Sequence, residues 1–89
     1  MSYRLVIAKP AESSLRRLDP ALLAFVHERL SALAADPGLG RSCVAPVPCY
    51  LFGFSLDHRG ERWDFAAQYR IAREEDLVVE SLGWMVVRG

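Results

Sequence analysis

The sequence predicts an α+β domain in which an N-terminal strand and a two-helix hairpin precede a three-stranded antiparallel meander. Residues 62–72 alternate polar and apolar side chains with a period of two, as in a strand with one buried face. Residues 21–35 repeat apolar side chains every three or four positions, as in an amphipathic helix. Turn sequences at 58–61 and 73–76 divide the C-terminal half into three strands. At 89 residues, the chain is expected to form one domain over 1–89.

The opening segment, Tyr3–Ala8, is rich in β-forming residues and is predicted to be the first strand. Lys9 and Pro10 end this strand, because proline cannot donate to a sheet ladder and suits the first turn of a helix. A short helix is then expected over Ala11–Leu18.

A second helix is predicted from Ala21 to Ala35. It begins at Asp19 and Pro20, because aspartate is a preferred N-cap residue and proline a preferred first helical residue. The Asp-Pro-Gly sequence at 36–38 ends it. The apolar stripe expected to face the sheet comprises Leu23, Val26, Leu30 and Leu33, with Leu22 and Phe25 beside it.

Three strands are expected to complete the sheet, which the helices cover on one side and the first strand joins. Cys49–Asp57 follows a loop over Leu39–Pro48, and Arg62–Ala72 follows the next turn. The last strand, Leu77–Val87, is apolar on both faces apart from Glu80 and Ser81, so it is predicted to be central or covered by a partner. The buried face of the middle strand is expected to carry Trp63, Phe65, Ala67, Tyr69 and Ile71.

The charge balance limits the classes of partner. Lysine and arginine together number 11, as do aspartate and glutamate, so the formal net charge is zero. This balance argues against a strong non-specific nucleic-acid binder, although it leaves room for a local basic patch. The N-terminal residues do not resemble a signal peptide, and no apolar run reaches the roughly 20 residues that span a bilayer. We therefore expect a cytoplasmic protein without a membrane partner.

The sequence predicts neither a metal site nor a cofactor. Cys43 and Cys49 are its only cysteines, and two reduced thiols are expected because disulfides are rare in the cytoplasm. His58 adds too few ligands for a zinc site. A small-molecule enzyme also lacks support, since no paired carboxylates, nucleophile–base pair or glycine-rich phosphate loop is recognisable.

The order of elements resembles the RelE/ParE superfamily of bacterial type II toxins. Four segments carry the resemblance, and together they cover most of the layout. They are the strand Tyr3–Ile7, the late Leu-Arg-Arg-Leu of the first helix, the leucine-rich segment Leu30–Pro37 that ends in Asp-Pro, and Tyr69–Ile71, which is similar to a Tyr-Arg-Val/Ile element of the central strand. The resemblance implies a βααβββ fold, a toxin role and an antitoxin protein as partner.

The sequence also departs from the ribonucleases of this superfamily. They are usually basic and carry a tyrosine or histidine after the last strand, whereas this sequence closes with Val86–Gly89. Asp64 and Glu80 add negative charge on or near the surface that would approach RNA.

Arg70 is the first candidate catalytic residue, because it is the arginine of the Tyr-Arg-Ile match and lies on the predicted polar face. RNA cleavage through a 2′-hydroxyl needs negative charge stabilised on the phosphate, which a preorganised guanidinium can provide. The structural alternative is a cross-strand salt bridge between Arg70 and Glu80. Arg62 could assist Arg70, and Arg59 could hold a backbone phosphate, although hairpin arginines are usually solvated.

Arginine is a poor proton carrier, so the proton is assigned to Lys9 or His58. A turn histidine without an orienting partner is, alternatively, incidental. Arg41 and Arg88 are candidate RNA-binding residues, the first in the loop before the meander and the second near the end of the sequence. Chain ends are often frayed, which is the structural alternative for Arg88.

Two functions from different classes follow. The first is a toxin, most simply a ribosome-dependent mRNA interferase that cleaves mRNA in the ribosomal A site and is neutralised by an antitoxin. A gyrase-inhibiting toxin would share the fold. The second is a catalytically degenerate protein that acts as an interaction module, which the neutral charge and the missing tail favour.

Overall fold

The computed structural model describes residues 2–43, 49–73 and 75–88. The predicted order of a strand, two helices and three long strands is confirmed, and one short strand, β2, is added. The elements are β1 (Arg4–Ile7), α1 (Lys9–Leu15), α2 (Pro20–Ala35), the 3-10 helix η1 (Pro37–Leu39), β2 (Arg41–Cys43), β3 (Cys49–His58), β4 (Glu61–Ala72) and β5 (Asp76–Arg88).

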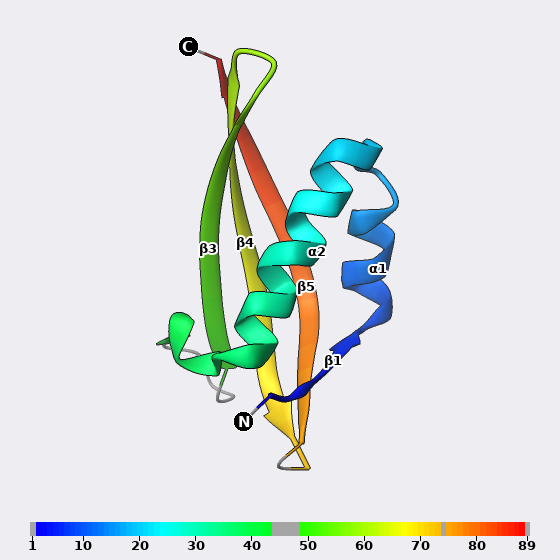
Figure 1. The fold of residues 1–89 in the computed structure, drawn as a ribbon, viewed down its shortest axis with the longest axis vertical. Coiled ribbons are helices and arrows are strands. Elements are labelled where there is room, and N and C mark those ends of the chain that lie inside the picture. Colours follow the sequence, from blue (N-terminus) through cyan, green and yellow to red (C-terminus); the bar gives the residue numbers. More distant parts are fainter. Residues whose placement is uncertain (1, 44–48, 74, 89) are drawn as a thin grey trace.

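All strands belong to one five-stranded sheet in the order β1-β5-β4-β3-β2. β1 runs parallel to β5, and every other neighbouring pair is antiparallel. Parallel neighbours need a crossover connection, and the α1–α2 hairpin is the first part of it. Both helices therefore lie on the same side of the sheet (Figure 1).

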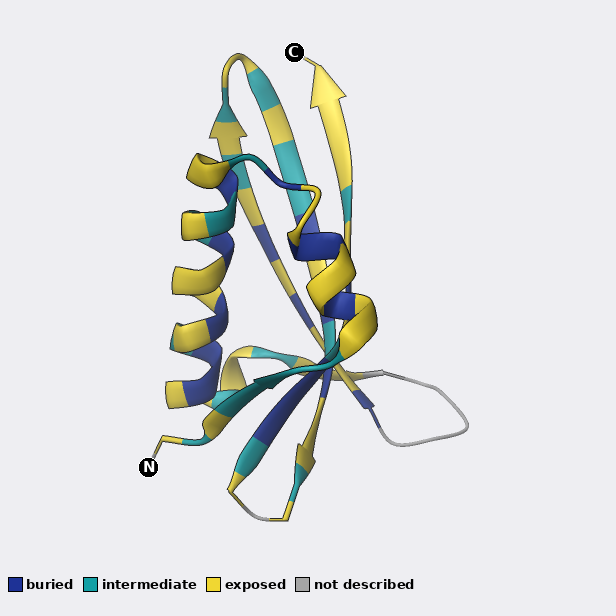
Figure 2. Cartoon of the chain, turned by 90° about the vertical axis from the view of Figure 1, so that its right-hand side faces the viewer, coloured by how far each residue is buried: buried dark blue, intermediate teal, exposed yellow. Residues whose placement is uncertain are grey.

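The hydrophobic core lies between the helices and the sheet. In Figure 2 the buried residues of α2 face the sheet and its exposed residues face away. The predicted stripe is confirmed for Val26, Leu30 and Leu33, which are completely covered, but it includes Leu22 rather than the half-buried Leu23. Each such aliphatic side chain stabilises the fold by about 1.5–3 kcal/mol relative to its exposed state.

The ends of the helices follow their capping chemistry. The Asp19 side chain accepts a 3.0 Å hydrogen bond from the Leu22 amide, which confirms the predicted N-cap of α2. The first helix was predicted over Ala11–Leu18, but α1 begins and ends earlier and spans Lys9–Leu15. Its first turn already contains Pro10, which needs no amide hydrogen bond there.

The two faces of β4 differ as predicted, with one irregularity. Phe65, Ala67 and Tyr69 are buried beneath the helices. Ile71 was expected to be buried with them but is 36% exposed, because it lines an open pocket with Pro37 and Tyr50. Between β4 and β5 the register shifts at Gln68/Tyr69, so one residue of β5 has no partner in β4. By this register the unpaired residue is Glu80.

β5 is central only over its first residues. Residues 76–79 pair with β1 on one side and with β4 on the other. Leu77, Val78 and Val79 are accordingly buried. Beyond that segment β5 pairs with β4 alone, and Met85 is 68% exposed. The prediction of a central strand is therefore confirmed for the first part of β5.

The expectation of two reduced cysteines is wrong, because Cys49 is disulfide-bonded. The backbone of Cys49 pairs directly opposite that of Cys43, the other cysteine of the sequence, where β2 meets β3. The sequence did not predict this pairing, because β2 lies inside the segment Leu39–Pro48, which was predicted to be a loop. Residues 44–48 of that segment fall outside the described residues.

Candidate functional site on the helix-free face of the sheet

The face of the sheet that points away from both helices carries most of the strand arginines, and we call it the outer face. Its residues follow from the core residues of the opposite face, the strand registers and the alternation of side chains along each strand. They include Arg4 and Val6 of β1, Arg41 of β2, Cys49, Leu51, Gly53, Ser55 and Asp57 of β3, Arg62, Asp64, Ala66, Gln68, Arg70 and Ala72 of β4, and Asp76, Val78, Ser81, Gly83, Met85 and Val87 of β5.

Arg70 lies on the outer face near the end of β4, as predicted, and pairs across the strands with Val78. Its Nε donates to the carboxylate of Glu80 on β5. The cross-strand salt bridge that the sequence offered as the structural alternative is therefore present. Both side chains remain accessible to solvent, at 50% for Arg70 and 37% for Glu80.

Arg62 lies at the opposite end of β4 and on the same face. Its Nε donates a 2.9 Å hydrogen bond to Asp64, which also accepts a 2.6 Å hydrogen bond from the hydroxyl of Ser55. These bonds, first that from Ser55 and then that from Arg62, lower the pKa of Asp64 below its usual value. Eight residues separate Arg62 from Arg70, or about 26 Å at about 3.3 Å per residue. The two arginines cannot contact the same phosphate group.

The structure also contains an arginine–carboxylate pair between β1 and β5 that was not predicted from the sequence. Arg4 of β1 donates two 2.9 Å hydrogen bonds to the two carboxylate oxygens of Asp76 on β5. These residues are 72 positions apart, and only the parallel pairing of β1 with β5 brings them together. Sequence reasoning had no local signal for this contact beyond the opposite charges.

Arg88 and His58 are each held by a neighbour on the helix side of the sheet. Arg88 donates a 3.0 Å hydrogen bond to Glu61, its direct partner across β4 and β5. His58 ends β3, and its Nε2 lies 3.3 Å from the carboxylate of Asp19 at the start of α2. His58 thus has an orienting partner, but it points away from Arg70.

Lys9 lies apart from both groups. It is the first residue of α1 and lines a shallow pocket of about 230 Å³ with Glu12, Ser13 and Arg16. Because this pocket is on the helix layer, Lys9 does not face the outer surface of the sheet where Arg70 lies.

Arg41 and Arg59 have no carboxylate partner within the described parts of the chain. Arg59 occupies the β3–β4 turn with a φ of 54°, at the same end as Arg62. Arg41 lies on the outer face opposite Leu51, which in turn lies opposite Gln68. Strands are about 4.8 Å apart, so Arg41 is about 10 Å across the sheet from β4 and close to the level of Arg70. Of the seven predicted residues, Arg70 and Arg41 share one end of the outer face.

Comparison with known proteins gives the fold. A chain of the crystal structure of the toxin–antitoxin complex RelBE2 from Mycobacterium tuberculosis superposes with a TM-score of 0.70 and 24% identity, over 96% of this chain and 93% of that one. A mutant of E. coli toxin RelE in the free state superposes with a TM-score of 0.67 and 20% identity, over 93% of this chain and 83% of that one. The chain has the RelE fold. No protein-family model matches the sequence, and no curated protein matches it significantly.

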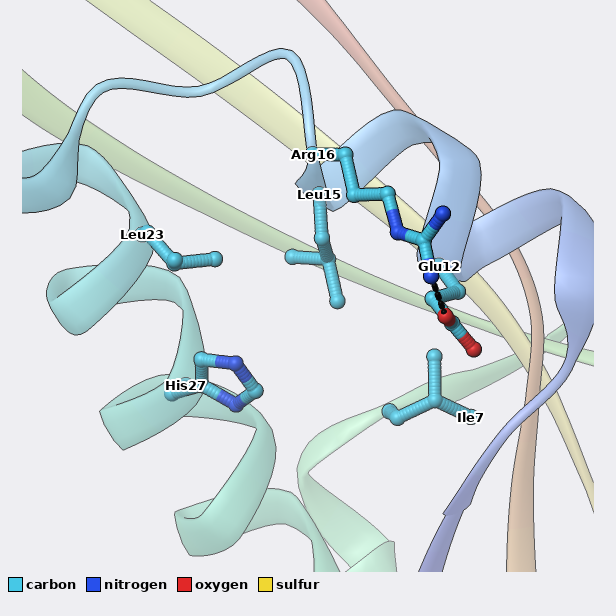
Figure 3. A pocket seen from close by; sticks show the side chains of 6 residues that line it. All are labelled: Ile7, Glu12, Leu15, Arg16, Leu23 and His27. Atoms are coloured by element: carbon cyan, nitrogen blue, oxygen red, sulfur yellow. Dashed lines mark hydrogen bonds and ion pairs between the residues drawn. The ribbon is translucent and has the colours of Figure 1, made fainter.

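A pocket of this RelE-like structure lies elsewhere, between α1 and α2. It measures about 330 Å³, and Figure 3 shows Ile7, Leu15 and Leu23 forming its apolar walls, with the Arg16–Glu12 pair at its edge. His27 completes the lining. None of the seven predicted site residues contributes to it.

Within the described residues, no three histidine, cysteine, aspartate or glutamate side chains come together in a way that could hold a metal ion. Neither helix combines the length and the apolar composition that a membrane-spanning segment needs.

Proposed function

We propose that this protein is the toxin component of a type II toxin–antitoxin pair and that a partner antitoxin neutralises it. The observation that carries the proposal is the match in fold over nearly the whole chain to a toxin and to a chain of a toxin–antitoxin complex. Because fold alone does not imply activity, the action of the toxin is argued from its own residues.

The proposed action is cleavage of ribosome-bound mRNA, with Arg70 stabilising the negative charge that develops on the phosphate. Arg70 is half exposed, and Arg41 near its level could bind an adjacent phosphate of the same strand. Lys9 and His58 are on other faces, so neither accompanies Arg70 as a proton carrier. The ribosome would position the RNA and supply the missing groups, as proximity effects allow.

A second function is favoured by a specific observation. Three arginines of the outer face, Arg4, Arg62 and Arg70, each bind a carboxylate of this same chain. A surface with its charges already compensated suits a protein partner better than RNA, whose binding depends on free cations. The alternative is therefore an interaction module with a toxin fold and no nuclease activity.

Expression in bacteria distinguishes the two functions. The chain is expressed alone and together with the protein encoded by the neighbouring reading frame, and growth and the integrity of ribosome-bound mRNA are followed. The toxin proposal predicts growth arrest that the neighbour relieves and that Arg70→Ala abolishes. Arg29→Ala, at an exposed position of α2, is the matched control and should remain toxic. Harmless expression of the wild-type protein with intact mRNA would leave the interaction module as the function.

A further inference from the structure

The arginine–carboxylate pairs of the outer face differ in how firmly each acid is held. Asp76 receives both 2.9 Å hydrogen bonds of Arg4, in the two-point geometry that guanidinium and carboxylate groups favour. Asp64 is held from two sides, by Arg62 at 2.9 Å and by Ser55 at 2.6 Å. Arg4 is therefore held by its acid at two points, whereas Arg62 is held by Asp64 through one hydrogen bond, and Asp64 keeps its bond from Ser55 when Arg62 leaves.

Glu80 is held by one contact only. In the described part of the chain its sole hydrogen-bond and ion-pair partner is the Nε of Arg70. The terminal nitrogens of Arg70 have no partner among the same residues. Exposed ion pairs of this kind contribute little to stability, because water and salt screen them. The Arg70–Glu80 pair therefore opens at less cost than the two-point Arg4–Asp76 pair.

The position of Glu80 follows from the irregular register of β5. Tyr69 pairs with Val79 and Gln68 pairs with Ser81, so Glu80 is the extra residue of the bulge. Bulges redirect a side chain that would otherwise follow the regular alternation of the strand. Here the redirected carboxylate meets Arg70, whose own backbone partner is Val78.

We propose that Glu80 is a competing internal ligand of Arg70, which occupies its guanidinium until the phosphate of an RNA strand displaces the carboxylate. Glu80 sets the affinity of the site for phosphate and restricts Arg70 to ligands that outcompete one carboxylate. A phosphate group does so because it can bind the free terminal nitrogens of Arg70 at two points as the glutamate leaves. The inference rests on the proposed role of Arg70 in RNA binding.

The test uses the full chain and a fluorescein-labelled single-stranded RNA of twelve nucleotides, with fluorescence anisotropy measured at several salt concentrations. Glu80→Gln should tighten RNA binding by about threefold to tenfold at low salt, because it frees Arg70 and keeps the side chain's size. Asp57→Asn is the matched control, since it removes one negative charge from the same face at an exposed residue that forms an ion pair with no arginine of the described residues. It should change the affinity by less than about twofold.

Two further measurements separate this mechanism from a general effect of charge. In an Arg70→Ala background, Glu80→Gln should lose its effect, as a double-mutant cycle requires of coupled residues. The Nε–H proton of Arg70 should exchange with solvent more slowly in the wild type than in Glu80→Gln. The proposal is overturned if Glu80→Gln and Asp57→Asn act equally, if the gain persists without Arg70, or if neither protein binds the RNA. Tighter binding by Glu80→Gln with no growth arrest in cells would instead uphold it and refute the toxin activity.

Discussion

The hydroxyl of Tyr69 in β4 donates a 2.7 Å hydrogen bond to the carbonyl oxygen of Pro37, at the start of the 3-10 helix that follows α2. Tyr69 is almost completely buried, and burial raises the pKa of its hydroxyl, which therefore remains a donor at all physiological pH values. This bond ties the end of the helix layer to the central strand of the sheet, at the residue directly before Arg70, whose side chain lies on the opposite face.

We expect Tyr69→Phe to lower the free energy of unfolding by about 1–2 kcal/mol, because the Pro37 carbonyl loses its donor while the ring still fills the core. Urea denaturation followed by circular dichroism measures the change. Tyr50→Phe is the control, since Tyr50 stacks on Tyr69 but is 39% exposed. An equal loss in both variants would contradict a specific role for the hydrogen bond.

Gly40 leaves room for the Tyr69 hydroxyl. A Cβ atom at this position would lie 2.0 Å from the Tyr69 oxygen, far inside contact distance. Because Tyr69 is buried and hydrogen-bonded, it cannot move aside, and Gly40→Ala should destabilise the protein by about 1–3 kcal/mol. Gly83→Ala is the matched control, since nothing lies within 4 Å of a Cβ there. Thermal unfolding of the two variants should separate clearly, and similar melting temperatures would argue against the close approach.

Asp19 connects the start of α2 to the end of β3, through the Leu22 amide at 3.0 Å and His58 at 3.3 Å. Replacing it with alanine should lower the melting temperature, because the helix loses its cap and the strand loses its tether. Asp57→Ala, at an exposed position of β3, should leave the melting temperature nearly unchanged.

The contribution of Asp19 should also depend on pH. The hydrogen bond from Leu22, and secondarily the contact with His58, lower the pKa of Asp19 below its usual value of 3.8. A folded-state pKa below the unfolded one means that the unfolded state takes up the proton first. The stabilisation is therefore complete above about pH 5 and is lost as the pH falls through the folded pKa. The melting-temperature difference between wild type and Asp19→Ala should be constant from pH 7 to 5 and shrink below 3.8. A difference that grew towards low pH would reverse this assignment.

Arg62 and Arg70 should act independently on RNA, since about 26 Å of strand separates them. Losses in affinity of Arg62→Ala and Arg70→Ala, measured by anisotropy, should multiply in the double variant to within about twofold. Each variant should also lower the slope of log affinity against log salt concentration by about one, because each removes one contact to a phosphate. A double variant no weaker than the single Arg70→Ala variant would place both arginines on one phosphate, which the geometry of β4 forbids.

Local chemistry in the sequence was enough to determine the order of the elements, the covered face of α2 and its cap at Asp19. These features depend on neighbours a few residues apart, so the periodicity of 3.6 or 2 and the preference for Asp-Pro report them directly. The polar face of β4 could be predicted in the same way, and with it the place of Arg70.

Only the tertiary structure decided which charged residues of the candidate site are paired and which of them lie together. Whether Arg70 is free depends on the bulge that turns Glu80 towards it, and the pairing of Arg4 with Asp76 depends on a parallel contact across 72 positions. His58 left the predicted site because the end of β3 meets the start of α2. These three contacts have one physical reason in common. Strand register and crossover geometry arise from the packing of distant segments, so they cannot be predicted from a run of neighbouring residues.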